Sequence, residues 1–154
     1  MKKVLFVVAS LCMFSCSTKK QVTQQETYET PQEVIKVSLK DDNTFVLHEI
    51  SSDATYGLSE KNPIQVGGVS TNEGPKNERR FLNALAGPNG EKVTYHRAGS
   101  CCAIKSKNDP LGTGRVMLDN YRVTWEGSKD TTSIYINMYD AGPLKAPKGF
   151  TIKD

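Results

Sequence analysis

Residues 75–86 have the sequence PKNERRFLNALA and are followed by Gly87-Pro88. A proline in the first turn and a Gly-Pro pair just after the last residue are typical of the two ends of an α-helix. At about 100° per residue, Arg79 and Asn83 lie on one side of this helix. The large apolar side chains lie on the opposite stripe: Phe81, Leu82 and Leu85. We therefore predict one amphipathic helix over residues 75–86, with its apolar stripe covered by another layer.

Runs of β-branched and aromatic residues on both sides of this helix predict strands over residues 34–39, 44–50, 93–98, 116–126 and 133–139. Asp41-Asp42-Asn43 has the composition of a hairpin turn, and Asn89-Gly90 turns the chain out of the helix. The last two runs alternate in polarity, as strands with one covered face do. The side chains that share a face are Tyr121, Val123 and Trp125 in one run and Ile134, Ile136 and Met138 in the other. The sequence therefore predicts an α+β domain: an antiparallel sheet of about five strands with one main helix packed on one face.

The chain begins with the pattern of a secretory signal. Lys2 and Lys3 precede an apolar run over residues 4–14, and small Ser15 precedes Cys16. The run is shorter than the roughly 20 apolar residues that a membrane-spanning helix needs. Residues 13–16, MFSC, are similar to a lipobox, so we predict that residues 1–15 are a signal peptide and that Cys16 becomes the lipid-modified N-terminus. A plain secretory signal or a short anchor helix are the alternatives.

The mature chain divides into a tail and a domain. Residues 16–32 are rich in Thr, Gln, Lys and Glu, which predicts a lipidated N-terminus and a flexible tether, and residues 33–154 form a single domain. Removal of Lys2 and Lys3 leaves 18 Lys and Arg against 17 Asp and Glu. This balance implies no basic patch, so we expect no nucleic acid as a partner. Several acyl chains attach a protein stably to a membrane. We expect this chain to be anchored to the outer membrane, with its domain facing the periplasm.

Cys101 and Cys102 are the thiols that remain once Cys12 leaves with the signal peptide and Cys16 is acylated. Adjacent Cα atoms lie about 3.8 Å apart, closer than in usual disulfides, so a bond between neighbouring cysteines is strained and easily reduced. Three interpretations stay open. The pair lies on a strand or turn with one sulfur in the core; it forms a structural vicinal disulfide; or it has a redox, ligand-binding or nucleophilic role.

Four polar residues are further candidates for a site. Glu78 lies on the apolar stripe of the helix, so we expect it to pair with an arginine such as Arg97, or to serve as a general acid or base. Arg80 flanks the stripe and is expected to reach the sheet through packing and an ion pair. His96 is close enough in sequence to Cys101 for a Cys-His pair, although no third group accompanies it. The spacing of these residues is not that of a metal site, and we expect neither metal nor cofactor.

Several motifs together resemble a group of small lipoproteins of Bacteroidota, over roughly residues 56–150. The motifs are Tyr56-Gly57, Asn62-Pro63-Ile64, Val66-Gly67-Gly68, the stretch Asn77 to Leu85 with Gly87-Pro88-Asn89-Gly90-Glu91, Gly99-Ser100-Cys101-Cys102, and Tyr135-Ile136-Asn137-Met138-Tyr139-Asp140. Some chains of this kind carry the name 2-dehydro-3-deoxyphosphooctonate aldolase, which implies phosphoenolpyruvate and arabinose 5-phosphate as substrates.

Two classes of function follow. We expect a membrane-anchored envelope lipoprotein whose domain binds an envelope protein or glycan, or has a structural role, without catalysing a reaction. The alternative is a small enzyme that uses Cys101 or Cys102, or the aldolase that the resemblance implies. A pocket that gathers Glu78, His96, an arginine and a cysteine would favour the enzyme, whereas dispersed side chains would favour the binding protein.

Overall fold

The computed structural model describes residues 37–154. The predicted signal peptide, the lipidation site Cys16, the tether and residues 34–36 lie outside this range, and the expectations about them stay predictions. Residues 37–154 belong to one compact unit with a single main hydrophobic core. No helix among the described residues is long and apolar enough to span a bilayer.

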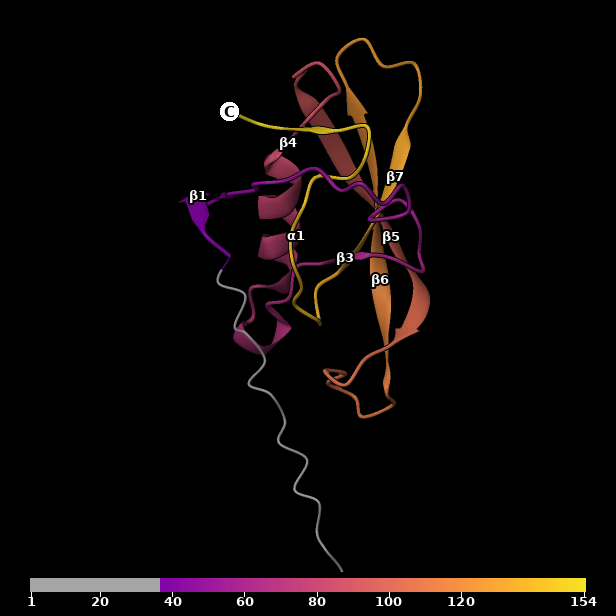
Figure 1. Ribbon diagram of the computed structural model, residues 1–154. Coiled ribbons are helices and arrows are strands. Elements are labelled where there is room, and N and C mark those ends of the chain that lie inside the picture. The colour runs from indigo at the N-terminus through magenta and orange to yellow at the C-terminus, as the bar shows by residue number, and fades with distance from the viewer. Residues whose placement is uncertain (1–36) are drawn as a thin grey trace, which may run out of the picture. The chain divides into compact units, whose positions relative to one another are not determined.

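A four-stranded sheet forms the centre of the fold (Figure 1). Its strands, in spatial order, are β3 (Ile64–Gln65), β7 (Thr132–Asn137), β6 (Arg115–Trp125) and β5 (Val93–Lys105). β5, β6 and β7 pair antiparallel, whereas β3 pairs parallel with β7. The predicted α+β class is confirmed. The prediction of about five strands in one antiparallel sheet is wrong, because a short parallel strand enters from a loop and the remaining strands pair elsewhere.

Short elements surround this sheet. They are the hairpin of β1 (Leu39–Asp41) and β2 (Thr44–Phe45), the 3-10 helix η1 (Val69–Thr71), the helix α1 (Gly74–Asn83), and the antiparallel pair of β4 (Leu85–Ala86) and β8 (Thr151–Ile152). The predicted hairpin turn is confirmed, since the Asn43 N–H donates to the Asp41 carboxylate at 2.8 Å. The predicted strand 44–50 is too long. Beyond Phe45 the Val46 N–H donates to the Ser38 carbonyl at 2.8 Å, Leu47 is buried in the core, and the next pairing is an isolated bridge between Ile50 and Ala146.

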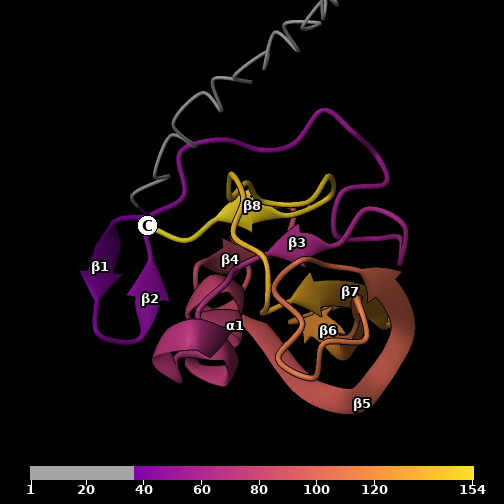
Figure 2. The same ribbon diagram turned by 90° about the horizontal axis from the view of Figure 1, so that it is seen from below.

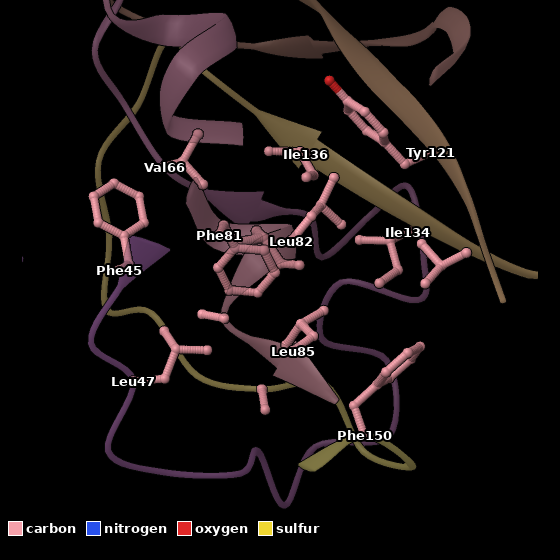
Figure 3. Close-up of a cluster of buried hydrophobic side chains, with 14 residues drawn as sticks. Phe45, Leu47, Val66, Phe81, Leu82, Leu85, Tyr121, Ile134, Ile136 and Phe150 are labelled. Carbon is pink, nitrogen blue, oxygen red and sulfur yellow. The ribbon is translucent and has the colours of Figure 1, made fainter. Parts of the chain in front are cut away.

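The hydrophobic core lies between α1 and one face of the sheet (Figure 3). Phe81, Leu82 and Leu85 are buried and Arg79 is exposed, which confirms the predicted helix face. The sheet contributes the side chains that were expected to share a face, and loops close the ends of the cluster. These buried partners are Tyr121, Val123, Ile134 and Ile136 from the sheet and Phe45, Leu47 and Phe150 from the surrounding chain.

The helix ends earlier than its sequence predicts. α1 stops at Asn83, and Leu85–Ala86 forms β4 instead of a further turn. Leu85 pairs with Ile152, and the Lys153 N–H donates to the Ala84 carbonyl at 2.9 Å. The C-terminal segment therefore satisfies backbone groups that are unpaired at a helix end.

β5 is the longest strand and extends beyond the predicted range 93–98. Its register with β6 shifts between Arg97 and Gly99 and again between Cys101 and Ile104. Such bulges bend a strand and increase its twist. Figure 2 shows β5 curving around β6 and β7. The Cys101-Cys102 pair consequently lies within a bent strand, at its second irregularity.

Candidate functional site

Glu78 is fully buried at the interface between α1 and β6. It is 0% exposed, and its Oε2 accepts a hydrogen bond from the Tyr121 hydroxyl at 2.9 Å. Tyr121 in turn packs edge-on against Tyr95, with ring centroids 6.0 Å apart. The expectation that Glu78 pairs with Arg97 is wrong: its hydrogen-bond partner is a neutral phenol from the facing strand.

Arg97 pairs with Asp119, a residue that the sequence analysis did not single out. Its Nε lies 2.5 Å from one Asp119 oxygen, and its NH2 donates to the other at 2.7 Å. The Ser100 hydroxyl donates to the same carboxylate at 3.0 Å. Asp119 is 4% exposed whereas the Arg97 side chain is 47% exposed, so the guanidinium covers a buried carboxylate from the solvent side.

Burial raises the pKa of Glu78 to about 8, and the neighbouring Asp119 charge adds to that shift. Glu78 is therefore mostly protonated at neutral pH. The Tyr121 hydrogen bond and the Arg97 charge oppose the shift without cancelling it. Oε1 of Glu78 receives no hydrogen bond from a described residue. Hydrogen bonding between the Glu78 and Asp119 side chains is a further cause of the raised pKa, because it needs the proton that an ionised Glu78 lacks.

Arg80 joins the β1–β2 hairpin to α1. The expected ion pair forms, with Glu73, but the expectation that Arg80 reaches the central sheet is wrong. Its Nε donates to the Asp42 carbonyl at 2.9 Å, and its NH1 donates to Glu73 at 2.7 Å and to Asn77 at 2.8 Å. The residue is 8% exposed. Removing this buried guanidinium would take away the donor of the Asp42 carbonyl and of the Asn77 side-chain oxygen, so Arg80 has a structural role.

Cys101 and Cys102 are free thiols at the second bulge of β5. Cys101 is the register partner of Leu118, and Cys102 has a left-handed backbone with φ 56°. Hydrogen bonding to Cys101, burial and hydrogen bonding to Glu60 raise the pKa of Cys102 to about 12. The thiolate is the nucleophilic form, so these surroundings suppress nucleophilic chemistry at Cys102.

His96 is exposed and does not form a catalytic pair with either cysteine. Its register partner on β6 is Arg122, whereas that of Cys101 is Leu118. Four residues along a strand span about 13 Å, which is well beyond hydrogen-bond reach. His96 and the cysteines are also separated from the Glu78 carboxylate, because Ser100 faces Asp119 and its neighbour Cys101 points to the other face of the strand.

A pocket of about 400 Å³ opens at the end of α1. Its walls come from α1, β4, the following turn, the start of β5 and the residue after β8. The lining residues are Leu82, Asn83, Leu85, Ala86, Gly90, Glu91, Lys92, Val93, Tyr95 and Lys153. None of the residues predicted as a site is among them. Within residues 37–154, no group of three or more His, Cys, Asp and Glu side chains is placed to hold a metal ion.

Strand alternation was the signal that could have identified Asp119. It lies two residues before Tyr121 and therefore on the same, covered face of β6. The pocket had no such signal: most of its lining lies within residues 82–95, but the chain there changes from helix to strand to turn to strand, and Lys153 joins it from the other end of the domain's sequence.

The arrangement of the predicted residues is better suited to holding the fold together than to a reaction. Glu78 and Asp119 share a buried polar cluster closed by Arg97, Arg80 joins two elements, and the cysteines lie at a bulge. No protein-family model, curated protein or solved structure matches this chain.

Proposed function

We propose that the chain is an envelope lipoprotein, attached through an acylated Cys16 to the outer membrane on its periplasmic side. The domain acts as a non-enzymatic binding or structural module for an envelope protein or glycan. One observation carries the non-enzymatic part of this proposal: the side chains with catalytic chemistry are dispersed, and the pocket of about 400 Å³ is lined by other residues.

Catalysis would need these groups to meet a substrate together. Glu78 is 0% exposed and is closed off by Tyr121 and Asp119. His96 points to solvent, and the pKa of Cys102 is raised to about 12. These placements favour the binding module over an enzyme that uses Glu78, His96 or the cysteines.

The aldolase implied by the resemblance has little support from the fold. The established enzyme of that name is a (β/α)8 barrel, which takes at least about 200 residues. Residues 37–154 instead form a four-stranded mixed sheet with one α-helix. The two arginines of the predicted site, Arg80 and Arg97, are both engaged with carboxylates, so neither is free to hold the anionic substrates of a condensation.

A turnover assay tests the non-enzymatic proposal. Residues 33–154 are incubated with phosphoenolpyruvate and arabinose 5-phosphate, and the condensation product is sought by mass spectrometry. We expect no product above the protein-free control. Product formation that is lost in Glu78→Gln or Cys101→Ser, and retained in the exposed-residue control Glu126→Gln, would overturn the proposal.

A further inference from the structure

We propose that the pocket at the end of α1 binds an amphipathic anion, an aliphatic carboxylate with an apolar body of pocket size. The inference rests on the proposed binding function and specifies its ligand. The pocket volume of about 400 Å³ lies in the range of small-molecule sites, roughly 300–1,000 Å³.

One wall of the pocket is apolar. Val93 and Tyr95, both half-buried, offer apolar surface to a ligand at the start of β5. The other apolar lining residues belong to the core: Leu82, Leu85 and Ala86 are 0%, 2% and 4% exposed and so have almost no surface left to cover. An aliphatic body that covers Val93 and Tyr95 removes apolar surface from water, which favours binding. A purely polar ion would not gain this contribution.

The rim of the pocket is cationic. Lys92 and Lys153 line it, and neither forms a salt bridge with another residue of the described chain. Glu91 is the acidic lining residue. Its carboxylate accepts hydrogen bonds from the backbone and side-chain nitrogens of Asn89, both at 2.8 Å, and these lower its pKa and keep it ionised. Two lysines and one glutamate leave the lining with a net charge of +1, which favours an anionic head group.

Two polar lining residues, Tyr95 and Asn83, already have partners within the domain. The Tyr95 hydroxyl donates to Asn83 at 2.7 Å, and the Asn83 amide donates to the Asn43 carbonyl at 2.8 Å. Tyr95 and Asn83 thus already form hydrogen bonds within the domain. Lys92 and Lys153, which form no salt bridge with a described residue, are the groups that bind the anion.

The backbone around the pocket argues against an extended peptide as the ligand. The Gly87 N–H donates to the Glu91 carbonyl at 2.8 Å, the Lys153 N–H donates to Ala84, and Ala86 bridges to Lys92. A peptide bound by strand addition needs free backbone donors and acceptors, which these pairings use. An aliphatic chain needs none.

Trp125 provides a built-in reporter for binding. It is the single tryptophan of the chain, and its register partner is the lining residue Val93. Octanoate, octanol and inorganic phosphate are titrated separately into residues 33–154 while the tryptophan fluorescence is followed. We expect saturable binding of octanoate, at least tenfold tighter than octanol or phosphate. The preference for octanoate over octanol should fall as ionic strength rises.

Two double variants separate the pocket from general charge effects. Lys92→Gln/Lys153→Gln should abolish the preference for octanoate over octanol. Lys105→Gln/Lys107→Gln, which removes the same charge at the other end of β5, should retain it.

Three results would overturn the inference: octanol binding as tightly as octanoate, phosphate binding as tightly as octanoate, or a preference for octanoate that survives in Lys92→Gln/Lys153→Gln. A protein that binds none of the three probes would also overturn it. Because membrane attachment and turnover are measured separately, that failure would leave the proposed function standing.

Discussion

Tyr121 on β6 donates its hydroxyl hydrogen to Glu78 on α1 at 2.9 Å, inside the interface that holds the helix against the sheet. Both residues are buried, and Asp119 lies beside them under the Arg97 guanidinium. A buried carboxyl group costs stability when it ionises, because the charge loses its hydration. The packing of α1 is therefore coupled to the protonation of one side chain.

This coupling predicts that stability falls as pH rises. Burial raises the folded-state pKa of Glu78 to about 8 from the ordinary 4.5, so between these values the folded protein holds a proton that the unfolded chain releases. The stabilisation that protonation provides is complete below about pH 4.5 and is lost as pH rises through 8. The free energy of unfolding should decrease by up to about 1.4 kcal/mol per pH unit. Urea melts from pH 5 to 8.5 measure this slope.

Glu78→Gln isolates the contribution of the carboxyl group. A glutamine can accept the Tyr121 hydrogen bond and donate towards Asp119 without titrating. Its melts should lose most of the slope between pH 5 and 8.5, whereas the exposed control Glu126→Gln should keep the slope of the unmodified domain. An unchanged slope in Glu78→Gln would show that another group titrates.

Leu85→Ala should destabilise the domain by roughly 2–5 kcal/mol, because it opens a cavity at a site that is 2% exposed. Arg79→Ala, on the exposed side of α1, should change the free energy of unfolding by less than about 0.5 kcal/mol. Urea melts at a fixed pH compare the two variants. Equal losses would contradict the assigned faces, even though Leu85 belongs to β4 and not to the predicted helix.

The long amphipathic segments could be predicted from the sequence because their periodicity directly reflects burial. Phe81 and Leu82 on the helix, and Ile134 and Ile136 on the last long strand, are all buried as their spacing indicates. The two-residue strands β3, β4 and β8 could not be predicted in this way. β3 pairs with β7 through Ile64 and Gln65 only, and so short a run carries no period.

The candidate site was predicted less well, because local periodicity does not show which residues of other elements a side chain will meet. A helical wheel placed Glu78 on the buried stripe, yet it could not show which residue of another element lies opposite. Tyr121 is separated from Glu78 by 43 residues. Asp119 then pairs with Arg97, the arginine that had been expected to neutralise Glu78. Contacts between segments distant in sequence thus determine which side chains pair, whereas local periodicity indicates only which face of a helix or strand is buried.

Cys102 should react slowly with iodoacetamide in the folded protein. Its pKa is raised to about 12 by hydrogen bonding to Cys101, by burial and by Glu60, which leaves little thiolate at pH 8. Peptide mass spectrometry after timed alkylation should show modification at Cys102 more than tenfold slower than in the urea-unfolded chain. Glu60→Gln removes a negative charge that disfavours the thiolate and should speed the reaction, whereas Glu126→Gln should not. Fast alkylation of the folded domain at Cys102 would instead favour a nucleophilic role.

Cys16→Ala should abolish acylation and release the protein from the membrane, because Cys16 is the predicted site of the lipid anchor. Metabolic labelling with an alkyne-bearing palmitate measures acylation, and fractionation of cells measures attachment. The matched control is Cys12→Ala, which changes the other cysteine near the predicted cleavage site and should leave both the label and the membrane fraction unchanged. Palmitate labelling that persists in Cys16→Ala, or an unlabelled variant that still sediments with membranes, would contradict anchoring through this residue. Loss of the label in Cys12→Ala alone would move the attachment site to Cys12.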